Sequence, residues 1–153
     1  MPCDLKTVLI VDDKECIRTS MAILFEEFGY SVCFAEDGHS ALLQINEQSP
    51  DILLSDLKMP GMSGRELLNN VRLLFPVIKV IATSGSFCGN KVPPGILADA
   101  FYPKGSSVSA LLHILRELPQ MKCRLPESLA AEHCAEPRNT ETIASPIDTY
   151  LSA

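Results

Sequence analysis

The sequence contains five polar side chains whose types could together bind a cation and handle a phosphoryl group. Each comes at the end of a short apolar segment of the kind that forms a strand buried on both faces. Ligands of open α/β sheets bind beyond the carboxyl ends of the parallel strands, so we expect these side chains to converge on one rim. The five residues are Asp12, Asp13, Asp56, Ser84 and Lys104.

Three of the five side chains are carboxylates, which repel one another when they meet at one point. A divalent cation removes this repulsion, and oxygen ligands without His or Cys favour Mg²⁺, or Mn²⁺ in its place. A carboxylate can attack a phosphoryl group and form an aspartyl phosphate. Lys104 and the cation would then offset charge on the phosphoryl oxygens, and Ser84 could donate a hydrogen bond to one of them.

Taken one at a time, the five residues have ordinary explanations. The aspartates are typical helix caps or turn residues, Ser84-Gly85 is common in turns, and a lone lysine is usually a solvated surface residue. All these explanations would have to hold together at the ends of four separate apolar segments, the first of which is followed by both Asp12 and Asp13. The joint placement therefore favours a functional site over five unrelated surface residues.

Alternating strands and helices must position these residues. The apolar segments predict strands over 7–11, 31–35, 51–55, 79–83 and 100–102, and helical spacing of apolar residues predicts helices over 17–28, 41–45, 66–75 and 107–118. We expect Asp13 to cap the first helix and Ser107 the last. Pro93-Pro94-Gly95 disrupts any helix between the last two strands, leaving at most a short one over 96–100.

Length and composition limit the classes of protein. The chain has 153 residues and a net charge of −6, with 13 basic and 19 acidic residues and no basic stripe, which argues against direct nucleic-acid binding. Its start does not resemble a signal peptide, and no apolar run reaches membrane-spanning length, so we expect a cytoplasmic protein. The six cysteines contain no Cys-x-x-Cys pair and are interpreted as ordinary thiols rather than disulfides or zinc ligands. One domain over 5–118 and a mostly disordered tail over 119–153, with a weak helix over 125–136, are predicted.

Four segments of the sequence resemble the receiver domain of two-component response regulators, the phospho-acceptor module related to the chemotaxis regulator. The segments read VLIVDD at 8–13, DLKMPGMSG at 56–64, IATSG at 81–85 and FYPK at 101–104. The resemblance covers roughly 5–118. It implies an α/β fold with a doubly wound, five-stranded parallel sheet in the flavodoxin-like order 2-1-3-4-5, here with a degraded fourth helix.

The resemblance also implies the roles of the acidic residues. Asp56 corresponds to the phospho-acceptor of the family. Asp12 and Asp13 correspond to its acidic Mg²⁺ site, to which Asp56 and the backbone carbonyl of Lys58 also belong. Mg²⁺ is the one cofactor that the resemblance implies.

Three further residues match the switch machinery of the family. Ser84 matches the hydroxyl switch residue, Phe101 the aromatic switch position that rotates inward, and Lys104 the lysine of the catalytic set. The sequence departs from the family pattern at Gly105, where a proline usually follows the lysine, and at Pro93-Pro94-Gly95. We therefore expect the surface that the family uses for partners and dimers to be altered here.

The resemblance implies a stand-alone response regulator of a phosphorelay. Its donor would be a sensor histidine kinase or a phosphotransfer protein, and phosphorylation of Asp56 would switch binding to a downstream protein target. Such a domain is no enzyme in the ordinary sense, because it catalyses only its own phosphotransfer and dephosphorylation. Neither a nucleic acid nor a membrane is expected as a direct partner.

Two other functions remain open from the sequence. The first is a protein-binding adaptor whose phosphorylation is incidental, which the Pro-rich segments favour. The second is a phosphatase with an aspartyl nucleophile. Phosphatases that resemble haloacid dehalogenases place a second Asp two residues after the nucleophile, and Lys58 stands there, which ranks this alternative low.

Overall fold

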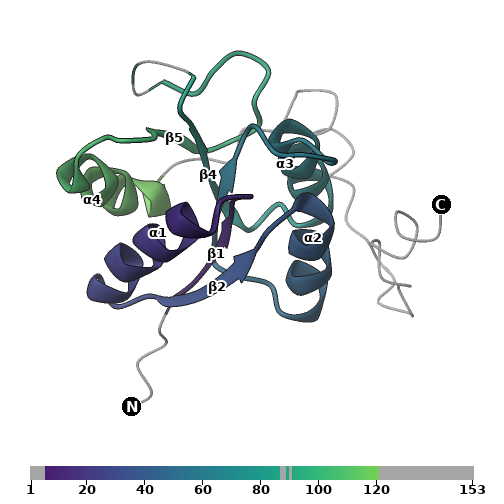
Figure 1. Ribbon diagram of the computed structural model, residues 1–153, viewed down its shortest axis with the longest axis horizontal. Coiled ribbons are helices and arrows are strands. Elements are labelled where there is room, and N and C mark those ends of the chain that lie inside the picture. The colour runs from purple at the N-terminus through teal and green to yellow at the C-terminus, as the bar shows by residue number, and fades with distance from the viewer. Residues whose placement is uncertain (1–5, 87–88, 90, 121–153) are drawn as a thin grey trace.

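A computed structural model describes residues 6–86, 89 and 91–120 of the chain. Figure 1 shows a central sheet with α1 and α4 on one side and α2 and α3 on the other. The sheet has five strands, all pairs parallel, in the order β2-β1-β3-β4-β5. This is the predicted doubly wound, flavodoxin-like arrangement, so the prediction of the fold class is confirmed.

The strands are the short apolar segments seen in the sequence. They are β1 (Thr7–Val11), β2 (Ser31–Ala35), β3 (Ile52–Asp56), β4 (Lys79–Ser84) and β5 (Ala100–Pro103). The central strand β3 is buried along its whole length. The apolar runs therefore predicted the strands well, because strands covered by helices on both faces need apolar side chains in both directions.

Four α-helices cover the sheet, and a short 3₁₀ helix follows the last one. They are α1 (Glu15–Glu27), α2 (Gly38–Glu47), α3 (Gly64–Leu74), α4 (Val108–Glu117) and the 3₁₀ helix η1 (Leu118–Gln120). Helices α2 and α3 begin with capping boxes at Asp37 and Ser63, each of which accepts a hydrogen bond from a backbone N–H of the first turn. The Ser107 side chain caps α4, as predicted.

The sheet separates two apolar cores. Side chains that alternate along each strand point to opposite faces, so every strand except β2 contributes buried residues to both cores. In β5, for example, Phe101 packs in the core under α2 and α3, whereas Tyr102 packs in the core under α1 and α4. Packing in the two cores fixes the position of each strand along its axis. It thereby fixes the position of the polar residue at the end of the strand.

Three expectations need correction or lie outside the described residues. Asp13 does not cap α1, because the residue at the cap is Lys14, which makes no side-chain cap hydrogen bond. No helix forms over 96–100: the described residues of 85–99 contain turns and bends, and Ala100 already belongs to β5. The predicted tail has only its first two residues, 119 and 120, in the described part, where they end η1; the expected helix over 125–136 lies outside it.

In the part of the chain that the structure describes, we find no helix with the length and apolar character needed to cross a bilayer.

Candidate functional site

Three carboxylates meet where β1 and β3 end. One oxygen from each of Asp12, Asp13 and Asp56 lies within 4.8 Å of the other two. Asp12 and Asp56 are buried, whereas Asp13 is exposed. They meet because β1 pairs directly with β3, so the ends of the two strands lie side by side. The structure thus brings together the acidic residues that the sequence predicted.

Lys104 completes this cluster from the end of β5. Its Nζ lies 2.7 Å from Asp12 Oδ2 and 2.9 Å from Asp56 Oδ2. Burial by itself lowers the pKa of Lys104, but its contacts with the two carboxylates and their charges outweigh the burial and raise that pKa above its usual value. The lysine is therefore charged and lies between the two buried aspartates.

One carboxylate oxygen of the cluster has incomplete bonding. Although Asp12 Oδ2 is close to the ammonium group of Lys104, it accepts no hydrogen bond of regular geometry. A buried oxygen of this kind, next to two further carboxylates, is suited to a hard cation. The donor set contains only oxygen atoms. The site therefore fits Mg²⁺ and offers none of the His or Cys ligands that zinc prefers.

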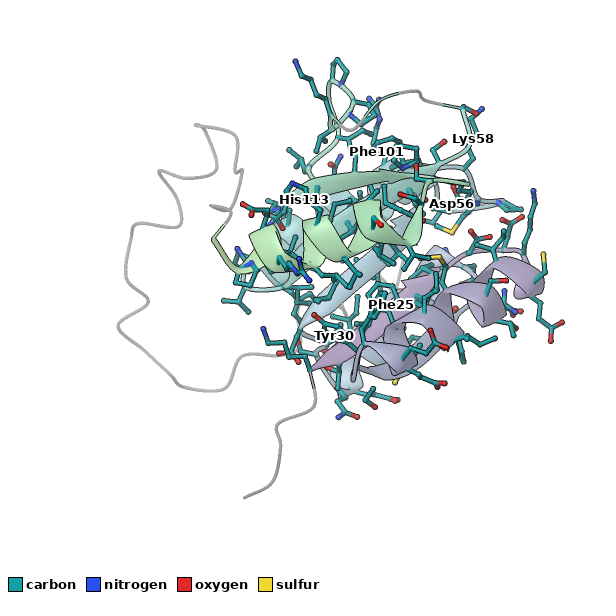
Figure 2. All side chains as sticks on the ribbon, turned by 90° about the vertical axis from the view of Figure 1, so that its left-hand side faces the viewer. Phe25, Tyr30, Asp56, Lys58, Phe101 and His113 are labelled. Atoms are coloured by element: carbon teal, nitrogen blue, oxygen red, sulfur yellow. The ribbon has the colours of Figure 1, made fainter. Side chains whose placement is uncertain are left out.

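The acceptor candidate Asp56 is held on both sides of its side chain. Its Oδ1 accepts a hydrogen bond from the backbone N–H of Lys58 at 3.2 Å, and its Oδ2 contacts Lys104. The Lys58 side chain is exposed. Figure 2 shows Asp56 and Lys58 near one end of the molecule, away from Tyr30, which lies toward the other end of the sheet. The carboxylate is thus buried and oriented, yet close to the surface loop that follows β3.

Gly64 allows this loop to fold back under Asp56. A Cβ at position 64 would lie 2.0 Å from the backbone oxygen of Asp56 and 2.5 Å from Cα of Leu57. The N–H of Gly64 also donates to the carbonyl of Leu57 at 3.2 Å. Only glycine fits here. The prediction of the site did not include Gly64, although the Ser63-x-x-Glu66 capping box marks the start of the helix that it opens.

The two predicted switch residues lie on neighbouring strands. Ser84 is buried at the end of β4, where its hydroxyl oxygen accepts a hydrogen bond from the N–H of Ser86 and its carbonyl accepts one from the N–H of Lys104. Phe101 is also buried and pairs in register with Ala82, two residues before Ser84. Ser84 therefore lies at the rim beside Lys104, whereas Phe101 lies in the core below it.

Gly105, which stands where the family pattern has a proline, adopts a left-handed backbone conformation. Its φ is +86°, in the left-handed region that side chains disfavour, and no atom lies near the place where its Cβ would be. The residue turns the chain directly after Lys104. The loop from Lys104 to Ser107 therefore reaches α4 without the proline that the family usually has.

A buried ion pair outside the rim was not predicted from the sequence. Arg72 of α3 contacts Asp99 at 3.0 Å, and both side chains are almost fully buried. Asp99 also accepts a hydrogen bond from the N–H of Val80 at 2.8 Å. This cluster ties α3 to the irregular segment before β5. The partners are 27 residues apart in sequence, and no local pattern joins them.

Comparison with known proteins agrees with this geometry. The sequence model of one protein family, the response regulator receiver domain, matches residues 8–93, which is more than half of the chain. Among curated proteins, the alkaline phosphatase synthesis transcriptional regulatory protein PhoP of Bacillus subtilis is 34% identical over 85 residues, covering 54% of this chain and 35% of PhoP. Sporulation initiation phosphotransferase F of the same organism is 38% identical over 74 residues, covering 48% of this chain and 60% of the relative.

A solved structure extends the likeness over a larger share of the chain. The response regulator protein TrrA of Thermotoga maritima, determined in complex with Mg²⁺-BeF, superposes with a TM-score of 0.68 at 27% identity. The match covers 74% of this chain and 99% of that protein. By contrast, the chain spans less than two thirds of the length of the two curated relatives.

Proposed function

Since the chain belongs to the response regulator receiver domain family, we propose that it is a phosphorelay switch that accepts a phosphoryl group on Asp56 in a Mg²⁺-dependent step. The observation that carries this proposal is the contact of Lys104 with both buried aspartates, Asp12 and Asp56. A lysine between two buried carboxylates at the ends of parallel strands offsets their negative charge before any ligand arrives. It is suited to a site where additional negative charge arrives.

The proposed reaction is a transfer between two side chains. A carboxylate oxygen of Asp56 forms a bond to phosphorus as the P–N bond of a phosphohistidine on the donor breaks, and the donor's imidazole nitrogen keeps the electron pair and takes up a proton. Hydrolysis later returns inorganic phosphate and the free carboxylate. In this sense the chain catalyses only its own phosphorylation and dephosphorylation.

Individual residues have separate roles in this proposal. Asp12, Asp13 and Asp56 would hold Mg²⁺ together with the backbone carbonyl of Lys58, and the ion would neutralise charge on the phosphoryl oxygens. Lys104 would pair with one of those oxygens. Its short contact with Asp56 supports this role, because the phosphoryl group would be attached at the same carboxylate.

Ser84 and Phe101 would report the phosphorylated state. The Ser84 hydroxyl accepts a hydrogen bond from Ser86 N–H and keeps its own hydrogen available for a phosphoryl oxygen. Phe101 lies in the core below Ser84, in register with Ala82 two residues earlier on β4. Movement of Ser84 toward the phosphoryl group would shift the packing of Phe101 and so the populations of two surface states.

The partners follow from this assignment. The donor would be a sensor histidine kinase or phosphotransfer protein, and the readout a downstream protein target in the cytoplasm. The receiver fold over 5–118 would carry these contacts, with residues 119–153 as a separate tail. Neither nucleic acid nor membrane is proposed as a direct partner.

Incubation with Mg²⁺ and acetyl phosphate, or with beryllofluoride, tests the proposal. Wild-type protein should show a change in its amide NMR spectrum near the rim, and Asp56→Asn should show none. Chelation of Mg²⁺ should abolish the wild-type change. If the wild-type spectrum does not respond, or if Asp56→Asn responds equally, the proposal fails.

One observation favours a second function, that of an adaptor whose phosphorylation is incidental. The described residues of 85–99 form no helix, so one element that receivers use for phosphorylation-dependent contacts is replaced by an irregular segment tied to α3 through Arg72 and Asp99. Equal partner affinity of wild type and Asp56→Asn, measured with and without phosphorylation, would support the adaptor over the switch.

A further inference from the structure

Asp12 is fixed at four different atoms. Its N–H donates to the carbonyl of Ala35 at 3.3 Å, its Oδ1 accepts from the N–H of Lys14 at 2.9 Å, and its Oδ2 lies 2.7 Å from Lys104 Nζ. The fourth contact is made by Arg18, whose Nη1 donates to the backbone carbonyl of Asp12 at 2.7 Å. Among these four contacts, the hydrogen bond from Arg18 is the one in which a side chain binds the backbone of Asp12.

Arg18 reaches back from the helix to the strand end. It lies in the first turns of α1 and is half-buried, and no ion pair of its guanidinium is found in the described part of the chain. Its contact with Asp12 therefore does not compete with a carboxylate. A hydrogen bond from a charged donor is stronger than one between neutral groups, so this contact ties the start of α1 to the end of β1.

Asp13, which lies between Asp12 and the start of α1, depends on the hydrogen bond from Arg18 to Asp12 for its position. Asp13 is exposed, and its side chain makes no hydrogen bond or ion pair within the described residues. Nothing but the backbone of the loop positions it. The helix cap does not help either, because Lys14 provides no side-chain cap for α1.

We propose that Arg18 is a positioning residue of the cation site, which sets the Mg²⁺ affinity by holding the backbone that carries Asp12 and Asp13. This inference rests on the proposed function, because it needs the acidic cluster to bind Mg²⁺. Arg18 touches neither the cation ligands' carboxylates nor the acceptor Asp56 in any contact found here. It acts through the loop alone.

Two effects of Arg18 have opposite signs. Its positive charge opposes binding of a cation, so charge alone predicts that Arg18→Ala binds Mg²⁺ more tightly. Loss of the backbone contact predicts weaker binding. The guanidinium is half-exposed and screened by water and salt, whereas groups that orient metal ligands typically change metal affinity 10- to 100-fold. Positioning therefore dominates, and the Kd of Arg18→Ala should rise about 10-fold.

The test is a Mg²⁺ titration of the full chain without any phosphoryl donor. The amide NMR signals of the rim residues report binding and give the Kd. The variants are Arg18→Ala, Arg18→Lys and Arg116→Ala. Arg116 is exposed in the last turn of α4, so its replacement changes the net charge equally while leaving the rim intact. We expect weaker binding by Arg18→Ala, partial recovery in Arg18→Lys, and wild-type affinity in Arg116→Ala.

Each outcome decides the inference. An unchanged or lower Kd in Arg18→Ala overturns it, because charge would then outweigh positioning. If Arg18→Ala fails to fold, Arg18→Lys decides alone: it should bind Mg²⁺ at least about 3-fold more weakly than wild type, and equal affinity would refute the role. Wild-type protein that binds no Mg²⁺ would refute the proposed function as well, whereas wild-type binding with an unaffected Arg18→Ala would refute only this inference.

Discussion

Lys104 Nζ lies 2.9 Å from Asp56 Oδ2, although the two residues are 48 positions apart and come from the ends of different strands. The contact crosses β4, which lies between β3 and β5 in the sheet. It joins the proposed acceptor to a charged group that also contacts Asp12. The lysine thus holds the acidic cluster together before any cation or phosphoryl group arrives.

Replacement of Lys104 tests this electrostatic role. We expect Lys104→Met to lower the free energy of unfolding of the metal-free protein by about 1–3 kcal/mol, because two buried carboxylates lose their charged partner. Added Mg²⁺ should restore part of the loss. Urea unfolding with and without Mg²⁺ measures both effects. Lys58→Met is the matched control, since Lys58 is exposed on the same rim and its side chain makes no ion pair within the described residues; equal stability of Lys104→Met and Lys58→Met would contradict the prediction.

Gly64 should tolerate no side chain. Gly64→Ala places a Cβ 2.0 Å from the Asp56 backbone oxygen, so the loop after β3 must shift. We expect a loss of about 3 kcal/mol in the free energy of unfolding, as for overpacked interiors, together with slower phosphorylation. Chemical denaturation checks the stability. Gly85→Ala serves as the control because its Cβ would meet no atom within 4 Å, and a loss of similar size there would show that the close approach is not the cause.

The capping residue Asp37 gives the stability a defined pH dependence. The N–H of Ser40, which donates to Asp37 Oδ1 at 2.7 Å, lowers the pKa of Asp37 below its usual value of 3.8, against a smaller opposing effect of burial. Because the pKa of Asp37 is lower in the folded state, its carboxylate contributes fully to the free energy of unfolding above pH 3.8. This contribution is lost as the pH falls through the folded-state pKa.

Asp37→Ala should accordingly cost about 1 kcal/mol at neutral pH, and progressively less as the pH falls below that value. Asp37→Asn, which keeps a capping oxygen that does not titrate, should lose little at neutral pH. Unfolding free energies of the three proteins across this range provide the measurement. A deficit of Asp37→Ala that stays constant into acid would show that the carboxylate charge is not involved.

The Arg72–Asp99 pair should stabilise the segment before β5. Removing one partner leaves a buried charge without its counterion, so Arg72→Met should cost about 3–5 kcal/mol. The double variant Arg72→Met/Asp99→Asn should cost less than the sum of the single ones, because the unpaired carboxylate is then absent. Urea unfolding of all four proteins gives this coupling. Additive losses would mean that the two residues act independently.

Much of the fold could be predicted because its signals are local. The strand β3 is buried on both faces and begins with the apolar run Ile52-Leu53-Leu54, and Ser107 is a capping residue directly before a periodic helix. The strand ends then placed the acidic residues and Lys104 at one rim. Local patterns did not predict contacts between residues that are far apart in the sequence and meet only through packing.

The predictions that were wrong or missing concern contacts that depend on packing rather than on local sequence. The sequence suggested Asp13 as a cap, but the neighbouring Asp12 carboxylate takes the N–H of Lys14, and the chain enters α1 without a side-chain cap. The close approach of Gly64 to Asp56 and the ion pair of Arg72 with Asp99 depend on how α3 packs on the sheet. The DLKMPGMSG segment contains both Asp56 and Gly64 but does not show that they pack together, and no pattern pairs Arg72 with Asp99.

Asp56 is the residue that we propose to carry the phosphoryl group. The most direct measurement is to incubate the full chain with acetyl phosphate and Mg²⁺, trap the acyl phosphate by borohydride reduction, and identify the modified residue by peptide mass spectrometry. We expect reduction at Asp56 in the wild type, none after chelation of Mg²⁺, and none in Asp56→Asn. Modification at Asp12 or Asp13 instead, or labelling of Asp56 that is independent of Mg²⁺, would contradict it.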